Sequence, residues 1–395
     1  MSEAFTKSFT QQEPIPEEGI EAAVAVMRHG RLHRYNLVAG EAGEAALLEE
    51  EFAAFVGARY CLAVASGGYG LGCALRAVGV RPGDRVLTNA FTLAPVPGAV
   101  AAVGAEPVLV EVTEDLVIDM EDLAAKAVAS GARVLMLSHM RGHICDMDRL
   151  MDLAGRLGLT VIEDCAHTMG ATWAGVPSGR HGAVGCHSTQ TYKHLNSGEG
   201  GLFVTDDAEV MSRAVMLSGS YMLFGRHRAS PPSEMFEKVK YETPNVSGRM
   251  DNVRAAILRP QLRELPRRIA RWNDLYRTVE AGLAGVPGLR TIPRPQAEAY
   301  VGSSIQFLLP GWDEGRIRAV LAACLARGVE LKWFGPAEPV AFTSRHVSWR
   351  YMAAQSLPAT DAVLAGLIDM RLPLTFDADD ARLIARIIGE EVARA

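Results

Sequence analysis

Lys193 is the residue of this 395-residue chain whose type and setting point most directly to covalent chemistry. Lysine is scarce, because the 40 lysines and arginines together include only six lysines. Lys193 lies in residues 187–201, HSTQTYKHLNSGEGG, between an apolar run and a glycine-rich turn. A lysine there can form a Schiff base with an aldehyde if its pKa is lowered. An isolated lysine would be interpreted as a solvated loop residue, but its scarcity and the flanking pattern favour chemistry here.

Asp164 is the second candidate, because it ends an apolar run in residues 161–167, VIEDCAH. In an open α/β sheet, ligands lie beyond the carboxyl ends of the strands. A carboxylate at that place could hold a cationic ring nitrogen. On this segment alone, a helix N-cap is an equally good interpretation.

A glycine-rich turn, residues 65–70 with the sequence ASGGYG, is the third candidate. Glycine lets the backbone approach a ligand, and the N-terminus of a following helix offers N–H donors and a positive dipole end. Both features suit a phosphate group. Taken alone, the segment is equally well explained as a tight turn.

Together the three segments favour pyridoxal phosphate (PLP) as a cofactor. A lysine would form the imine, an aspartate would keep the pyridine nitrogen protonated, and a helix N-terminus would bind the phosphate. Their occurrence in one chain and in this order is a stronger indication than any one of them.

The elements that must position these groups follow from short apolar runs that alternate with helical patterns. Strands are expected at residues 61–65, 84–87, 107–111, 133–138 and 160–163, and helices at residues 44–56, 72–78, 94–103, 120–130 and 147–157. This alternation indicates βαβ units and a mainly parallel sheet with helices on both faces. Residues 182–188 and 201–205 add two strands close enough in sequence to pair antiparallel.

The pattern changes after about residue 251 to that of a smaller α+β unit. Residues 252–283 are expected to form one long helix, kinked or broken near Pro260 and Pro266. Further elements are expected at residues 303–309 (strand), 314–327 (helix), 329–333 (strand) and 379–395 (helix). We therefore expect a large cofactor-binding domain, residues 1–255 with the N-terminal segment, and a small C-terminal domain, residues 256–395.

Composition narrows the class of partner. The net charge is -6 and no block of lysine and arginine is present, so nothing indicates a nucleic-acid partner. No apolar stretch reaches the roughly 18 residues that span a bilayer, and the polar N-terminus is unlike a signal peptide. Six scattered cysteines without a C-x-x-C pair indicate buried free thiols, so we expect a cytoplasmic protein.

In these segments the chain resembles the DegT/StrS family of PLP-dependent sugar aminotransferases, of fold type I in the aspartate aminotransferase-like superfamily. The resemblance extends over roughly residues 14–395, and the segment from Lys193 to Gly201 is its most diagnostic part. It implies a three-layer αβα large domain with a mostly parallel sheet and a small C-terminal α+β domain. It also implies transfer of an amino group from an amino-acid donor, glutamate or glutamine, to a keto-sugar or keto-cyclitol in secondary-metabolite or cell-surface sugar biosynthesis.

The resemblance implies roles for single residues. Lys193 would be the Schiff-base lysine and would move the proton, Asp164 would pair with the ring nitrogen, and His167 would lie near the ring's hydroxyl group. Some relatives carry histidine in place of this lysine and dehydrate sugars, so the lysine favours transamination.

Five further residues are implied around the cofactor. Gly67, Gly68 and Ser188 would contact the phosphate, and Leu93 stands where an aromatic residue usually stacks on the ring. Asn245 would reach the phosphate of a neighbouring subunit, which implies a homodimer with shared active sites.

The chain departs from the family pattern mainly around the cofactor and substrate. Gly68 replaces the usual threonine, Tyr69 a small residue, and Leu93 an aromatic residue, although Phe91 is close. Residues 139–143, HMRGH, replace a more apolar stretch. A metal site on these histidines is conceivable, but a segment that lines the substrate pocket is favoured.

Two alternative functions remain open. The first is another PLP reaction on the same scaffold, such as elimination, dehydration or β-replacement. The second is a non-catalytic regulatory relative, which should lack a competent pair of lysine and aspartate.

Overall fold

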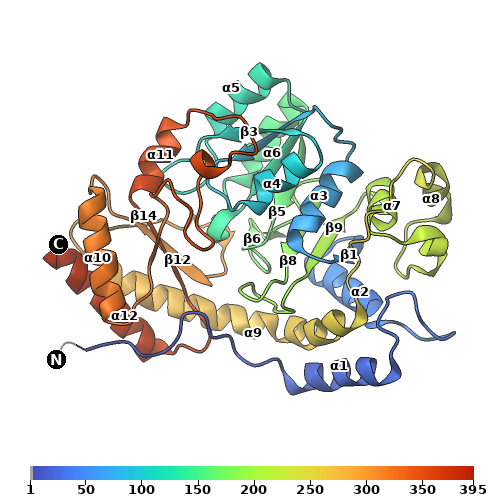
Figure 1. Ribbon diagram of the computed structural model, residues 1–395, viewed down its shortest axis with the longest axis horizontal. Helices are drawn as coiled ribbons and strands as arrows, with labels where there is room; N and C mark the ends of the chain where they lie inside the picture. Colours follow the sequence, from blue (N-terminus) through green and yellow to red (C-terminus); the bar gives the residue numbers. More distant parts are fainter. Residues whose placement is uncertain (1–2) are drawn as a thin grey trace.

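The computed structural model describes residues 3–395 and is built around a seven-stranded sheet with the order β1-β9-β8-β5-β4-β2-β3 (Figure 1). The strands are β1 (Tyr60–Val64), β2 (Arg85–Asn89), β3 (Glu106–Val110), β4 (Val134–Ser138), β5 (Thr160–Asp164), β8 (Val184–Ser188) and β9 (Gly201–Thr205). All neighbouring strands are parallel except β9, which is antiparallel to both β8 and β1. The mostly parallel sheet and the antiparallel pair β8–β9 were both predicted from the sequence.

Helices cover both faces of this sheet. Those that surround it are α2 (Glu44–Val56), α3 (Gly67–Ala77), α4 (Pro95–Ala102), α5 (Met120–Ser130), α6 (Met147–Leu157) and α7 (Ala208–Leu217). Side chains alternate along each strand, so Leu135 and Leu137 of β4 pack with α2, α5 and α6, whereas Val134 and Met136 pack with α3, α4 and α7. The large part of the chain is therefore the three-layer αβα arrangement that the sequence predicted.

One long helix, α9 (Asn252–Leu283), runs beneath the whole molecule, with α1 (Glu17–His29) along one half and α12 (Ala378–Arg394) along the other (Figure 1). The sequence predicted one long helix that is kinked or broken near Pro260 and Pro266; the helix is continuous, and both prolines lie inside it. Each proline removes one hydrogen bond of the helix, while α1, α2 and α12 pack against it. Since α9 passes through the expected boundary at residue 255, the division into domains stays a prediction.

The C-terminal part holds an antiparallel four-stranded sheet of order β10-β12-β14-β13. Its strands are β10 (Arg290–Thr291), β12 (Ser304–Leu308), β13 (Lys332–Trp333) and β14 (Leu367–Arg371), and its helices are α10 (Glu314–Ala326), α11 (Pro358–Ala365) and α12. Strand β14, helix α11 and the N-terminal helix α1 were not expected from the sequence. The two charged residues of β14, Asp369 and Arg371, interrupt its apolar pattern.

Shorter elements complete the chain. They are η1 (Met140–Gly142), β6 (Thr172–Trp173), β7 (Val176–Pro177), η2 (Tyr221–Arg226), α8 (Ser233–Val239), β11 (Glu298–Ala299) and η3 (His346–Ser348). Among residues 3–395, no helix combines the length and apolar character that crossing a bilayer requires.

Candidate active site

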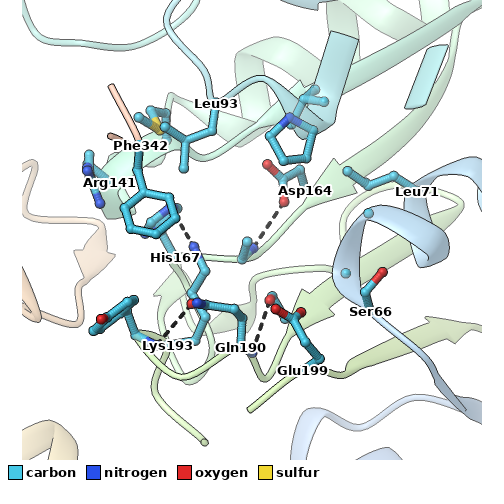
Figure 2. A pocket seen from close by; sticks show the side chains of 18 of the residues that line it. Ser66, Leu71, Leu93, Arg141, Asp164, His167, Gln190, Lys193, Glu199 and Phe342 are labelled. Carbon is cyan, nitrogen blue, oxygen red and sulfur yellow. Dashed lines mark hydrogen bonds between the residues drawn. The ribbon is translucent and has the colours of Figure 1, made fainter. Parts of the chain in front are cut away.

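The three segments singled out by the sequence meet at one cavity of about 430 Å³ beside the carboxyl ends of β4, β5 and β8 (Figure 2). Seven of the eight expected site residues line it: Gly67, Gly68, Leu93, Asp164, His167, Ser188 and Lys193. Because they come from four separate parts of the chain, the tertiary fold itself brings these groups together.

Lys193 lies in the turn that follows β8, where its backbone N–H donates to Gln190 O (2.8 Å). Its Nζ is 3.0 Å from Nε2 of His167. Burial and the nearby Arg141 lower the pKa of Lys193 to about 7, although Asp164 opposes this shift. Burial and Lys193 also hold the pKa of His167 well below its usual value, so this imidazole is neutral. The lysine can thus act as an uncharged nucleophile and as a proton carrier near neutral pH.

Asp164 ends β5 and is 7% exposed. Its Oδ2 accepts a hydrogen bond from Ser138 Oγ (2.8 Å), and that hydroxyl accepts one from Thr92 Oγ1 (2.8 Å). Its Oδ1 accepts from Ala166 N (3.1 Å) in a turn. No helix begins after β5, so the helix-cap interpretation of Asp164 is wrong. The carboxylate is fixed in one orientation in the cavity wall, as an anion that faces a cationic ring must be.

The N-terminus of α3 forms another wall of the cavity. Ser66 caps this helix, its Oγ accepting from Tyr69 N (3.0 Å), and the N–H groups of Gly67 and Gly68 precede the first intrahelical bond. A Cβ on Gly67 would lie 2.9 Å from Cβ of Ser188, so only glycine lets the end of β8 come this close. Free N–H groups, a dipole end and the Ser188 hydroxyl together suit a phosphate.

The departures from the family pattern have separate structural consequences. Tyr69 does not line the cavity; its hydroxyl donates to Leu217 O (2.9 Å), and its ring covers Gly248, where any side chain would clash with it. Leu93 lines the cavity, whereas Phe91 is buried against Phe334 with ring centroids 5.2 Å apart.

The segment 139–143 was expected to line the pocket rather than to bind a metal. Met140 and Arg141 do line the cavity, but the two histidines point elsewhere. His139 Nε2 lies 3.0 Å from Glu163 Oε2, and His143 Nε2 lies 2.8 Å from Gln306 Oε1. The histidines thus have different partners, which removes the basis for a metal held by both. They anchor the two ends of the turn that carries Arg141.

A buried group of His139, Glu163 and Cys165 has ligand atoms within 4.8 Å of one another. The Glu163 carboxylate already accepts backbone N–H groups from Gly179 (2.9 Å), His181 (2.8 Å) and Gly182 (2.7 Å). These bonds indicate a carboxylate that fixes a loop to β5, and they leave no reason to assign a metal.

Asn245 is the expected site residue that lies outside the cavity of its own chain. It is exposed, and its Oδ1 accepts from Ser247 N (3.1 Å). Its expected contact with a neighbouring subunit stays a prediction.

Phe342 and Arg371 of the C-terminal part line the cavity and were not expected from the sequence. Arg371 had one available signal, because it is a charged residue at the end of a mostly apolar run, whereas Phe342 carries no local pattern that marks a site. Gln190, Tyr192 and Glu199 also line the cavity; they lie in the segment 187–201 that the sequence singled out, although no role was predicted for them.

The model of the DegT/DnrJ/EryC1/StrS aminotransferase family matches residues 15–388. The dTDP-3-amino-3,4,6-trideoxy-alpha-D-glucose transaminase of Streptomyces venezuelae is 36% identical over 61% of this chain and 60% of that protein. The L-glutamine:scyllo-inosose aminotransferase of Streptomyces griseus is 34% identical over 63% of this chain and 59% of its own length. In both cases the match covers less than two-thirds of the relative.

Longer matches agree with these. The 3-amino-5-hydroxybenzoate synthase of Amycolatopsis mediterranei is 30% identical over 88% of this chain and 89% of that protein. A crystal structure of 3-amino-5-hydroxybenzoic acid synthase superposes with a TM-score of 0.83 at 25% identity, covering 98% and 99% of the two chains. A DegT DnrJ EryC1 StrS aminotransferase from Brucella abortus, 23% identical, shares the fold with a TM-score of 0.77 over 94% of each chain. The chain therefore belongs to the DegT/DnrJ/EryC1/StrS aminotransferase family.

Proposed function

We propose that this chain is a PLP-dependent aminotransferase that moves an amino group from glutamine or glutamate to a ketone, either a keto-sugar, a keto-cyclitol or a related cyclic ketone. The observation that carries the proposal is the meeting of Lys193 and Asp164 in one cavity beside the N-terminus of α3. The names of the relatives, an L-glutamine:cyclitol aminotransferase and a sugar transaminase among them, support the donor and acceptor classes.

The residues of the cavity fit PLP. Lys193 would hold its aldehyde end, Asp164 its ring nitrogen, and the N-terminus of α3 with Ser188 its phosphate. PLP, when bound, supplies an aldehyde that reacts with amines and a ring that accepts electrons. The absence of a Cβ on Gly67 supports this fit, because it lets Ser188 come close to the N-terminus of α3, where both can contact one phosphate.

The chain's own residues would then handle the proton. As an uncharged amine, Lys193 Nζ takes a proton from the carbon that bears the donor's amino group. As an ammonium, it returns a proton to the former carbonyl carbon of the acceptor. A pKa near 7 suits both directions, and the neutral His167, 3.0 Å away, orients the amine. The same cavity serves donor and acceptor in turn, which makes the kinetics ping-pong.

We further propose a homodimer with shared active sites. The exposed side chains of Leu32 and Tyr221 lie on two segments that both contact residues 249–252. Leu32 O accepts from Asn252 N (2.9 Å), and Cζ of Arg249 lies 5.7 Å from the centroid of the Tyr221 ring. In the sequence, the exposed Asn245 lies between Tyr221 and Arg249. Such a surface suits a second copy of the chain.

We also propose that the chain divides into two domains at residue 255 and that the protein is cytoplasmic. All six cysteines are free and buried, which supports a reducing compartment.

An absorbance scan of the purified protein with PLP tests the proposal. We expect a visible band from lysine-bound PLP that is lost in Lys193→Ala, while circular dichroism stays unchanged. Glutamine or glutamate should then yield pyridoxamine phosphate, and a ketone should reverse this change. If the donors leave the band unchanged, while an amino acid with a leaving group is converted to a keto acid and ammonia, the elimination alternative is correct.

A further inference from the structure

Two arginines line the cavity although the proposed proton transfers use neither. Arg371 ends β14, with its Cζ 3.9 Å from the centroid of the Tyr192 ring and 5.5 Å from that of Phe342. Stacking occupies the faces of a guanidinium group and leaves its N–H edge available for a planar anion. Arg371 is thus positioned by aromatic contacts while its donors remain available to a ligand.

Arg141 is 5% exposed and lies in the turn η1 with a φ of 56°. This left-handed conformation is uncommon for a residue with a side chain, and Arg141 is the one cavity-lining residue among the seven non-glycine residues with positive φ in the described part of the chain. Its Nη2 lies 2.7 Å from Asp369 Oδ2, but within residues 3–395 neither Nε nor Nη2 makes an aligned hydrogen bond. The ion pair with Asp369 holds this buried guanidinium group in the cavity wall, where its remaining donors can bind a further anion.

The charges around the arginines do not balance. Asp369 is fully buried, and its Oδ1 already accepts from Gln306 Nε2 (2.8 Å). Three cations lie near this carboxylate: Arg141, Arg371 and Lys332. Lys332 is also near a second carboxylate, the exposed Glu330, so the two arginines remain in excess. Burial and the two arginines lower the pKa of Lys332 to about 8 despite the attraction of Asp369, and burial and Arg141 lower that of Arg371.

The two carboxylates of the cavity lining, Glu199 and Asp164, do not remove this excess of positive charge. Glu199 also lines the cavity, but Figure 2 shows it beside Ser66, across the cavity from Arg141 and Phe342. Asp164 is already bound to Ser138 (2.8 Å) and is assigned to the cofactor. The wall formed by Arg141 and Arg371 therefore remains positive.

We propose that Arg141 and Arg371 form a carboxylate-binding subsite, and that the ketone acceptor of this enzyme carries a carboxylate close to its carbonyl carbon. The proposal rests on the proposed aminotransferase function and names its acceptor class. A neutral sugar or cyclitol would leave the positive charge of Arg141 and Arg371 in excess over the one carboxylate paired with them, Asp369, which is costly. The subsite shares one cavity of about 430 Å³ with Lys193, so the carboxylate and the reacting carbon belong to one small molecule.

Binding of benzoate and of its neutral analogue benzamide tests the subsite without turnover. Isothermal titration of the PLP-loaded enzyme should show benzoate binding about 10- to 100-fold more tightly, the range expected for hydrogen bonds to a charged group. Arg371→Gln should lose most of this preference, and Arg371→Lys, which keeps the charge, should retain part of it. Equal binding of the two probes to the unmodified enzyme overturns the subsite.

Arg316→Gln is the matched control. Arg316 also stacks on an aromatic ring, with its Cζ 3.6 Å from the centroid of Trp312, but it does not line the cavity. This variant should keep the full preference for benzoate. If it loses the preference as Arg371→Gln does, the effect is general to the fold and the assignment to Arg371 is wrong.

A carboxylate is also present on the amino donor, so the two half-reactions must be measured separately. The acceptor half is followed with a cyclohexanone that carries a carboxylate and with the corresponding carboxamide. Arg371→Gln should lower the ratio of kcat/KM for the carboxylate to kcat/KM for the carboxamide about 10- to 100-fold, a ratio from which any common effect on Lys193 cancels.

If Arg371→Gln slows only the glutamine half, and the enzyme accepts both ketones equally, the subsite serves the donor and the acceptor assignment is overturned. If neither glutamine nor glutamate converts the cofactor, the proposed function fails, while the benzoate titration still decides the subsite.

Discussion

At the scale of single residues, the pKa of Lys193 depends more on burial and on nearby cations than on nearby carboxylates. Burial, Arg141 and Arg371 lower the pKa of its amine, and the opposing attraction of Asp164 and Asp369 is weaker, so the value is about 7. Only the uncharged amine attacks an aldehyde. At neutral pH a large fraction of cofactor-free protein is therefore ready to react with PLP.

This setting predicts how cofactor capture depends on pH. The rate at which cofactor-free protein binds PLP covalently should rise with pH, with a midpoint near 7, and level off above it. Arg371→Gln removes a positive neighbour, so its midpoint should move to higher pH, whereas Arg316→Gln should leave it unchanged. Stopped-flow absorbance measures these rates. A midpoint near 10 for the unmodified protein would contradict the assigned effect of burial.

Asp164 predicts a loss of rate that is separable from binding. Asp164→Asn keeps the shape and the bond from Ser138 Oγ but removes the charge, so turnover should fall about 100-fold or more while PLP still binds. Ser138→Ala removes only one hydrogen bond, and its loss should be near tenfold. Single-turnover kinetics with glutamine measures both. Equal rates for Asp164→Asn and the unmodified enzyme would show that the carboxylate does not act on the ring.

At the scale of elements, the helices that begin and end with local signals were the most predictable. Asp119 caps α5 by accepting from Glu121 N, and Asp146 caps α6 by accepting from Arg149 N. Gly131 and Gly158 end these two helices with a left-handed φ. The sequence predicts both helices with the bounds that the structure has, because every determinant lies within the segment itself.

Elements whose stability comes from distant residues were not predictable in this way. The two charged residues of strand β14 have their partners in other parts of the chain. Asp369 pairs with Gln306 and Arg141, and Arg371 stacks on Tyr192 and Phe342. The residues of the candidate site divide in the same way into those that local sequence predicts and those that it does not. Residues next to the ends of the parallel strands, the turn of Arg141 included, could be found from motifs, whereas Arg371 and Phe342 reach the cavity only through tertiary packing.

Helix α3 carries a prediction about the departure at Gly68. A Cβ there would have its nearest neighbour at 3.8 Å, so a side chain fits without strain. Gly68→Ser should raise the free energy of unfolding by a few tenths of a kcal/mol, and its hydroxyl should tighten PLP binding about two- to tenfold. Denaturant titration and equilibrium PLP binding measure the two effects.

Two other glycines of α3 provide the controls. A Cβ on Gly72 would lie 4.0 Å from Val103, so Gly72→Ala should stabilise the helix without changing PLP affinity. Gly67→Ala places a Cβ 2.9 Å from that of Ser188 and should weaken PLP binding. Unchanged PLP affinity in both Gly68→Ser and Gly67→Ala would show that the phosphate does not lie at this helix.

At the scale of the whole molecule, the cavity depends on how the two parts of the chain are held together. Residues that would hold the cofactor come from the seven-stranded sheet and α3, whereas Arg371 and Phe342 come from the C-terminal part. Helix α9 packs against α2 on one side and α12 on the other, and so connects both (Figure 1). A change in packing around α9 would therefore first alter the side of the cavity formed by Arg371 and Phe342, where the acceptor is proposed to bind.

The exposed position of Asn245 extends this dependence to a second copy of the chain. If Asn245 acts in the cavity of its partner, a mixture of two inactive variants should recover activity. In a mixed dimer of Lys193→Ala with Asn245→Asp, one cavity combines an intact lysine with an intact asparagine from the other subunit. Random exchange should restore about a quarter of full activity, since half of the dimers are mixed and each has one intact site.

The experiment requires that Asn245→Asp alone is strongly impaired, because its carboxylate would repel the phosphate, and that subunits exchange before the assay. Mixing Lys193→Ala with Asp164→Ala is the control: both residues line the same chain's cavity, so every site keeps a defect and no activity returns. Recovery in the first mixture alone places Asn245 in the partner's site. If the first mixture stays as inactive as the control, or if light scattering finds only single chains at the assay concentration, the shared active site is excluded.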